Sequence, residues 1–457
     1  MTSPASRYFP RLLPLLAILA GCQGAPSAPL SAAALEDALA PPAWESLRVR
    51  ANAIRHPILR SVPFDERDGL SPDEAAVLAV LMNPSLRAIR DQRGIASAQS
   101  IQAGILPNPA LSAGASFAVH APDELPGYDL GLSWEVSSLV AVQAKSESAK
   151  AQAASVELDV AWKEWEAAQA AKIAVFRCAS LDAELAEARK VEERFAKGLD
   201  MVRKAAEERL KTTLDLAAAE AALQEARAAV LELEQDLRRQ RLLLNRALGL
   251  PPEARVRLQA GIRFPSTLAL PSARELESGL EERRLDLMAL KRGIESQEAT
   301  VRATVLSGFP RIELGVGYAR DPGGFHAVGP SLFVDLPLFD RNHGAVAAES
   351  ATRQKLLDEF VQRLFEARND VATALADAES LSRRIACAEE AVPTLERLVK
   401  VCADALPEGQ VDVLSCYGAQ NDLAKKVIEI WKLKQELVER RAELELASGR
   451  YLPEREG

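Results

Sequence analysis

The feature that most constrains this 457-residue chain is an apolar heptad repeat that continues through long segments of the sequence. Heptads kept over such lengths indicate coiled coils with left-handed supercoiling rather than ordinary amphipathic helices. The segment 344–405 alone, as a helix rising about 1.5 Å per residue, would span about 90 Å, which is too long for a compact domain. The stripes are Leu216, Leu223, Val230, Leu237 and Leu244; Leu357, Leu364, Val371, Ala378, Ile385, Val392 and Val399; Phe360, Ala367, Ala374, Leu381, Ala388, Leu395 and Cys402; and Cys416, Leu423, Ile430, Leu437 and Leu444.

The composition agrees with a mainly α-helical fold and excludes one class of partner. Aromatic residues make up only 5% of the chain, which favours long helices over a compact mixed fold. The formal net charge is -9. Because a protein that binds phosphate backbones would be basic, nucleic acid is not expected as a partner.

The chain is internally duplicated. Sliding the sequence by 201 positions places Pro109 and Leu111 on Pro310 and Ile312. This repeat predicts two copies of one unit that reads helix, two strands, long helices. The expected parts are a first repeat at 71–250, with a β-hairpin at about 107–138 and a helical hairpin at about 141–249; a connecting segment at 251–283; a second repeat at 284–449, with a β-hairpin at about 309–339 and a helical hairpin at about 344–448; and a C-terminal tail at 450–457.

Four short segments alternate between apolar and polar residues, as transmembrane strands do. They lie at 111–117, 130–136, 312–318 and 332–336. Alternation alone is equally consistent with soluble hairpins that cover a core. In a bilayer, four strands cannot close a barrel, and open edges would leave backbone groups without hydrogen bonds. Other copies must then supply strands, and both eight strands from two copies and twelve from three would close.

The N-terminus predicts export from the cytoplasm. Arg7 and Arg11 precede a short apolar run at 12–20, which is typical of a secretory signal and too short to span a bilayer. We therefore expect residues 1–21 to be a signal peptide.

Lipid attachment is expected directly after this signal. The apolar run ends in Leu-Ala-Gly followed by Cys22, which resembles a bacterial lipobox and implies acylation of Cys22; an ordinary leader with a chance cysteine is the alternative. Gln23 is not the aspartate that resembles an inner-membrane retention signal, so the outer membrane is implied. Residues 22–70 are then interpreted as a lipid-anchored, extended N-terminal arm, because they are rich in proline and show no sustained periodicity.

The other cysteines and the absence of catalytic motifs argue against a metalloprotein or an enzyme. These cysteines have no metal-ligand spacing, and the sequence has no nucleophile elbow, P-loop, zinc signature or glycine-rich phosphate loop. We expect no enzymatic activity, no cofactor and no resident metal. Cys402 and Cys416 lie seven residues on either side of Gly409. A turn there would bring them together, either as a disulfide or as two buried free thiols.

Five short motifs occur in order along the duplicated chain: Asn83-Pro84-Ser85-Leu86, Pro107-Asn108-Pro109-Ala110-Leu111, Leu248-Gly249, Leu336-Pro337-Leu338-Phe339-Asp340-Arg341-Asn342 with Gly344, and Gly409-Gln410-Val411-Asp412-Val413-Leu414. Together they resemble the TolC-like outer membrane efflux family, over most of the chain from about residue 70 to 446. The motif at 336–344 is similar to the branch of this family that serves heavy-metal efflux systems.

This resemblance implies a fold, a location and partners. The fold would be mainly α-helical with a small β part, in which a homotrimer shares one twelve-stranded β-barrel, four strands per chain, and continues it as an α-helical barrel. The protein would lie in the outer membrane of a Gram-negative bacterium, surrounded by lipid, with most of its helical mass in the periplasm. It would serve as the passive exit duct of a periplasmic adaptor and a proton-driven inner-membrane pump. Metal cations are the favoured cargo; a type I protein secretion channel, a drug efflux channel and a structural coiled-coil lipoprotein are the alternatives.

The resemblance also implies where the duct is gated. Asp412 matches the family position whose carboxylates ring the closed periplasmic entrance, beside Gly409 at the tip, and Asp215 is its counterpart in the first repeat. A ring of acids in a narrow pore favours cations. The alternative for both residues is a solvated acid near the start of a helix. Ser415 stands where some members carry a second acid, which makes this constriction less charged than theirs.

Overall fold

The computed structural model describes residues 29–40, 44–65, 67–117, 125–406, 411 and 413–452. The chain forms two compact units, residues 1–41 and 42–457. In the described part of the first unit, helix α2 (Ala32–Leu39) begins after Ser31, whose hydroxyl accepts a hydrogen bond from the Ala34 amide at 3.2 Å.

The second unit is mainly helical and contains a single four-stranded antiparallel sheet among its described residues. Its elements are α3 (Trp44–Asn52), α4 (Pro72–Met82), α5 (Pro84–Ala103), β1 (Ala110–Ser116), β2 (Gly127–Glu135), α6 (Leu139–Glu207), α7 (Thr213–Leu248), α8 (Ala273–Glu277), α9 (Leu280–Arg283), α10 (Leu285–Leu306), β3 (Arg311–Arg320), β4 (His326–Asp335), α11 (His343–Ala405) and α12 (Val413–Ser448).

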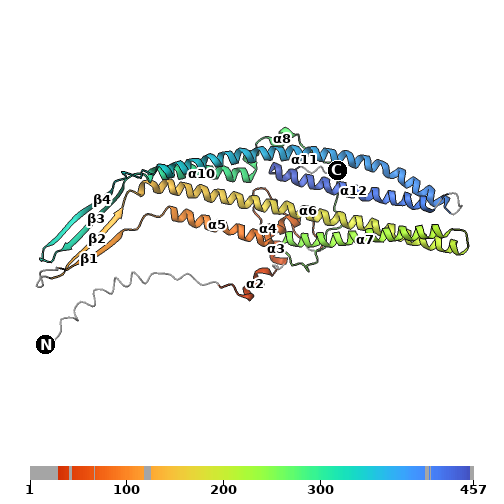
Figure 1. Ribbon diagram of the computed structural model, residues 1–457, viewed down its shortest axis with the longest axis horizontal. Coiled ribbons are helices and arrows are strands. Elements are labelled where there is room, and N and C mark those ends of the chain that lie inside the picture. The colour runs from red at the N-terminus through yellow and green to blue at the C-terminus, as the bar shows by residue number, and fades with distance from the viewer. Residues whose placement is uncertain are drawn as a thin grey trace, which may run out of the picture. The chain divides into compact units, whose positions relative to one another are not determined.

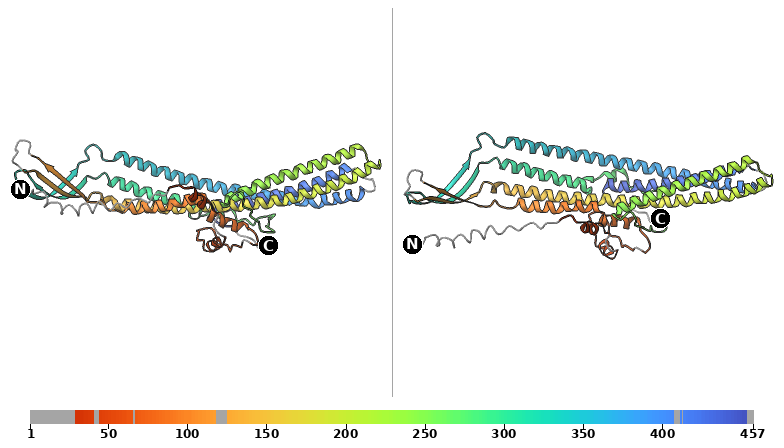
Figure 2. Two further views of the ribbon diagram at one scale, coloured as in Figure 1. Left: turned by 90° about the horizontal axis from the view of Figure 1, so that it is seen from below. Right: turned by 60° about the horizontal axis from the view of Figure 1, so that its bottom comes forward.

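Long antiparallel helix pairs make up most of this unit. Helix α6 packs along α7, α11 packs along α12, and α5 and α10 lie beside the first half of α6 (Figure 1). The strands lie at one end of the unit, and the C-terminal ends of α6 and α11 lie at the other (Figure 2). The second unit therefore has a sheet end and a helix-tip end.

The predicted heptad stripes form the seams between these helices. Leu223 and Leu237 are buried in α7, Ile385 is buried in α11, and Ile430 and Leu444 are buried in α12. The coiled-coil prediction is confirmed at these positions, because an apolar residue every seven positions stays on the side that faces the neighbouring helix.

The end of α7 shows why the predicted Leu248-Gly249 motif needs its glycine. Gly249 has φ 74°, in the left-handed region that favours glycine. A Cβ at this position would lie 2.8 Å from the Met82 carbonyl oxygen. The motif thus ends the helix and lets it pack closely against the end of α4.

Two described stretches of the N-terminal arm are helical, contrary to the prediction that residues 22–70 are extended. Residues 32–39 and 44–52 are helical, and the second of these helices buries Leu47 and Ala51 against α4 and α6. These two apolar residues are four positions apart, one helical turn, which is too short a pattern to identify a helix from sequence. Residues 44–65 therefore contribute Leu47, Ala51, Leu59 and Phe64 to the core.

Burial of His56 fixes the arm on α6. Its Nδ1 accepts hydrogen bonds from the Ile58 and Leu59 amides at 3.1 and 2.8 Å, and its Nε2 lies 2.9 Å from the Ala161 carbonyl oxygen. Since Nδ1 is an acceptor, Nε2 carries the proton and donates to Ala161. Desolvation lowers the pKa of His56, so the ring is neutral at neutral pH.

Candidate functional site

The candidate functional site is the sheet, whose strands are ordered β1-β2-β3-β4 (Figure 1). In one row across it, Leu111 lies opposite Leu132, which lies opposite Val316, which lies opposite Pro330. Side chains in such a row share a face, as do those two positions further along each strand. We call this side the apolar face; its residues are Leu111, Ala113, Ala115, Tyr128, Leu130, Leu132, Trp134, Ile312, Leu314, Val316, Tyr318, Val328, Pro330, Leu332 and Val334, with Arg320 and His326 at one end.

The other side of the sheet, the polar face, carries small and polar residues. They include Ser112, Gly114, Gly131, Ser133, Glu135, Glu313, Gly315, Gly317, Gly329, Ser331 and Asp335, with Phe333 as the large apolar exception. Gly315 is required by packing, because a Cβ there would lie 2.8 Å from the Leu132 carbonyl oxygen. The predicted alternation is therefore present in all four strands.

The apolar face is exposed, although its side chains are large. Leu132 is 49% exposed, Val316 50% and Leu332 66%. Strands β1 and β4 are the edges of the sheet, and no described strand pairs with their outer sides. A single chain therefore has an uncovered apolar surface and two open sheet edges, which in water favour association.

At the tip end, Asp215 takes part in a helix cap. Its carboxylate accepts hydrogen bonds from the Thr212 amide at 2.9 Å and the Thr212 hydroxyl at 2.8 Å, and the Thr212 hydroxyl accepts from the Asp215 amide. These two hydrogen bonds hold the pKa of Asp215 below its ordinary value, and the one from the Thr212 amide has the larger effect. Asp215 is thus an ionised acid in the first turn of α7, and within one chain it faces solvent.

The turn before this cap is built without glycine. Arg209 takes φ 60°, in the left-handed region. Leu210 and Leu214 on either side of the cap are strongly exposed. Of the other predicted site residues, Cys22, Gly409 and Asp412 lie outside the described residues.

Cys402 and Cys416 lie in one small apolar cluster between α11 and α12, together with Ala419. Both side chains are buried, and the Cys416 thiol donates a hydrogen bond to the Cys402 carbonyl oxygen at 3.4 Å. The structure thus brings the two predicted cysteines together in one buried cluster.

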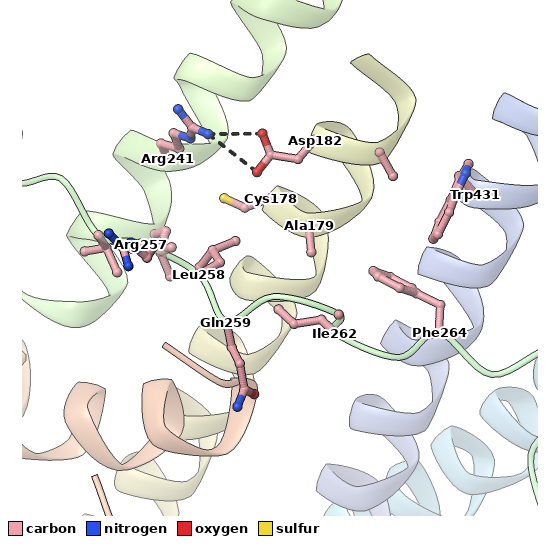
Figure 3. Close-up of a pocket in the computed structure, with 14 residues that line it drawn as sticks. Cys178, Ala179, Asp182, Arg241, Arg257, Leu258, Gln259, Ile262, Phe264 and Trp431 are labelled. Carbon is pink, nitrogen blue, oxygen red and sulfur yellow. Dashed lines mark hydrogen bonds and ion pairs between the residues drawn. The ribbon is translucent and has the colours of Figure 1, made fainter. Parts of the chain in front are cut away.

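A cavity of about 470 Å³ lies among α6, α7, α12 and the connecting segment (Figure 3). Trp431 and Phe264 line one side of it, and Arg241 and Asp182 form an ion pair of 3.0 Å on the other. Cys178 lies beside this ion pair, and burial raises its pKa to about 12. A thiol with so high a pKa is a poor nucleophile, so the cavity does not have the chemistry of a cysteine active site.

The described residues were compared with two simple requirements, those of a metal site and of a membrane-spanning helix, and meet neither. They contain no group of three or more histidine, cysteine, aspartate or glutamate residues arranged to hold a metal ion. No helix among them is both long enough and apolar enough to cross a membrane.

Comparison with solved structures identifies the fold. The chain is similar to CusC, with a TM-score of 0.69 and 17% identity over 87% of this chain and 98% of that one. It is also similar to the CmeC outer membrane channel of Campylobacter jejuni, with a TM-score of 0.71 and 13% identity over 93% of each chain. It is similar as well to the MtrE outer membrane channel of Neisseria gonorrhoeae, with a TM-score of 0.68 and 18% identity over 87% of this chain and 97% of that one. The chain has the fold of outer-membrane channels.

The sequence comparison is narrower. Residues 276–450, essentially the second repeat, match the family model described as "Outer membrane efflux protein". No curated protein sequence matches the chain. The TM-score with CusC is no higher than that with CmeC, so these comparisons do not distinguish the heavy-metal branch from others.

Sequence reasoning missed the loop end of the apolar face. The predicted alternation stops at Tyr318, whereas β3 continues to Arg320 and β4 begins at His326. One further step of period two from Tyr318 would have placed Arg320 on the same face.

Proposed function

We propose that this chain is one subunit of an outer-membrane exit duct that passively conducts small solutes and catalyses no reaction. The observation that carries the proposal is the exposed apolar face, opposite a polar face that suits a water-filled lumen. The match of residues 276–450 to the outer membrane efflux protein family and the shared channel fold support it.

The assembly would be a homotrimer in which the edge strands of neighbouring copies pair. Within a bilayer, the open edges of β1 and β4 would each leave unpaired backbone groups, at a cost of several kcal/mol per group. Three copies bring twelve strands and remove every edge. The same association would cover exposed apolar residues on the helices.

The helices would continue the duct across the periplasm. Helices α6 and α11 have 69 and 63 residues. At about 1.5 Å per residue, each is roughly 100 Å long. At their tip they would meet a periplasmic adaptor and a proton-driven inner-membrane pump, while an acylated Cys22 would attach the N-terminus to the outer membrane of a Gram-negative bacterium.

Reconstitution tests the duct itself. The purified protein, inserted into a planar bilayer, should give discrete conductance steps, and its cross-linked mass should be three times that of one chain. A water-soluble monomer that never conducts would refute the proposal. Because the same fold also serves other exporters, the conductance says nothing about cargo.

For the cargo, metal cations remain the proposal, supported by the motif at 336–344. Deletion of the gene should then sensitise the cell to at least one divalent metal. Unchanged tolerance to every metal, with increased sensitivity to hydrophobic drugs or a lost secreted protein, would favour a drug efflux channel or a type I secretion channel.

The periplasmic tip would carry the constriction. We place Asp412 in an acid ring, with Gly409 in the turn beside it and Asp215 as a weaker contributor, because Asp215 already caps α7. The acids would favour cations in the pore. Asp412→Asn should therefore reduce the cation preference of the channel, measured from reversal potentials, more than Asp215→Asn does. If both variants keep the cation preference of the unmodified channel, the acid ring is excluded.

Cys402 and Cys416 are proposed to form a disulfide when the protein is exposed to the oxidising periplasm. The step is thiol-disulfide exchange: a donor protein disulfide accepts two electrons, both thiols lose their protons, and one S–S bond joins α11 to α12. Their position in one apolar cluster supports this pairing, because a neutral disulfide is compatible with an apolar site.

Alkylation with iodoacetamide at pH 8, followed by mass spectrometry, tests this pairing. In the native protein, exposed Cys387 should react quickly. Cys178 should resist, since a pKa of about 12 leaves about one thiol in ten thousand ionised at that pH. After unfolding, protein kept oxidised should take up two alkyl groups fewer than reduced protein; equal uptake excludes the disulfide.

A further inference from the structure

One cation lies on the apolar face of the sheet, at the end furthest from the helices. Arg320 is the last residue of β3 and lies opposite Tyr128 on β2 and His326 on β4. The neighbouring row on the same face contains Tyr318. Figure 1 shows that the β2–β3 and β3–β4 pairs end here, away from α6 and α11. If the sheet spans the outer membrane as proposed above, this row lies at the outer leaflet.

The surroundings of Arg320 resemble a membrane interface. The Tyr128 and Tyr318 rings are 5.9 Å apart, and the Tyr318 hydroxyl lies 2.6 Å from Nδ1 of His326. Tyrosines gather at the level of lipid headgroups because their rings are apolar and their hydroxyls are polar. Phe325, in the adjacent turn, is 78% exposed. This end of the face thus combines apolar rings with polar groups at one depth.

Arg320 has no acidic partner among the described residues. Its Nε is buried and has no hydrogen-bond partner there. The nearby Asp321 carboxylate accepts a hydrogen bond from the Phe325 amide at 2.9 Å, and Asp129 lies on the polar face. Since the Nε is buried, the donors open to an anion from outside the chain are the terminal guanidinium nitrogens.

The other arginine of β3 shows the contrast. Arg311 begins the strand at the end nearest the helices and lies on the polar face. It pairs with Glu135 at 3.4 Å and with Glu313. Among the residues that the structure describes, this strand therefore has an arginine paired with acids at its helix end and an arginine without an acidic partner at its loop end.

We propose that Arg320, together with Tyr128, Tyr318 and His326, binds the phosphate group of an outer-leaflet lipid. This proposal rests on the membrane-spanning role of the sheet. A guanidinium donates two parallel hydrogen bonds to phosphate oxygens, while the tyrosine rings and Phe325 contact the first part of the acyl chains. The position on the lipid-facing side selects a lipid headgroup over free phosphate, which would be drawn to water-exposed cations instead.

The test uses the full-length protein inserted in phosphatidylcholine vesicles with added lipid A. Binding is measured as lipid A retained after transfer into detergent, counted by native mass spectrometry. Arg320→Gln should bind lipid A about tenfold more weakly, since a hydrogen bond to a charged group is lost. Arg320→Lys should recover part of the affinity, and Arg311→Gln, the matched control on the polar face, should bind normally.

A second measurement needs no variant. Removing the phosphates from lipid A should weaken its binding to the unmodified protein by a similar factor, and high salt should weaken binding of the phosphorylated form. The proposal is overturned if the unmodified protein retains both forms of lipid A equally. It is also overturned if the Arg320→Gln variant retains as much lipid A as the unmodified protein does. If lipid A binding fails but the inserted protein still conducts, only the lipid site is refuted and the proposed duct stands. If the protein never inserts, the proposed duct itself is refuted.

Discussion

Leu132→Arg is expected to prevent stable insertion into a bilayer, whereas Ser133→Arg, one residue further along β2, leaves insertion intact. Leu132 lies on the apolar face between Leu111 and Val316 and is 49% exposed. Arginine near the middle of the bilayer on the lipid face of a β-barrel costs about 2–4 kcal/mol, and a homotrimer would meet this cost three times.

Ser133→Arg is a sharp control because it introduces the same side chain into the same strand. Ser133 lies on the polar face opposite Gly315, whose lack of a side chain leaves room. An arginine there would lie in water within the lumen. Insertion is measured by flotation of vesicles and by the slower migration of unheated samples in gel electrophoresis. Equal insertion of both variants would contradict the assignment of the two faces.

The sequence predicted the long helices and the strands because their signals are periodic. Leu223 and Ile385 are buried as the heptads required, since one residue every seven positions stays on the same helix face. Leu314 and Val316 share a face because strand residues alternate with period two. Both patterns persist over enough residues to exclude chance, and they defined the fold class.

Features that depend on single residues or distant partners could not be predicted. Helix α3 buries only Leu47 and Ala51, and these two residues are its only signal in the sequence. Arg209 takes a left-handed backbone conformation, which favours glycine, although nothing in its sequence marks it for one. At the site, the alternation gave the two faces, but whether Arg320 has an acidic partner depends on strand register and on side chains that only the structure positions.

The Arg284 side chain is the strongest case of a distant partner, and its removal is expected to lower stability markedly. It donates to both Asp286 carboxylate oxygens, at 3.0 and 2.7 Å, and to the Ala447 carbonyl oxygen at 3.2 Å. Its guanidinium carbon lies 4.8 Å from the centre of the Trp162 ring. Arg284 thus joins the start of α10 to α6 and to the end of α12, linking both repeats.

Arg284→Met should lower stability by about 3–5 kcal/mol, because it leaves Asp286 buried without its main partner. The lower value is favoured, since Arg363 remains 3.5 Å from the Asp286 carboxylate. Adding Asp286→Asn should restore part of the loss by removing the buried charge. Arg292→Met breaks an exposed pair with Glu295 and should cost at most about 1 kcal/mol. Thermal melting of the helical circular dichroism signal compares the variants; if Arg284→Met melts like Arg292→Met, the buried Arg284–Asp286 pair does not stabilise the fold.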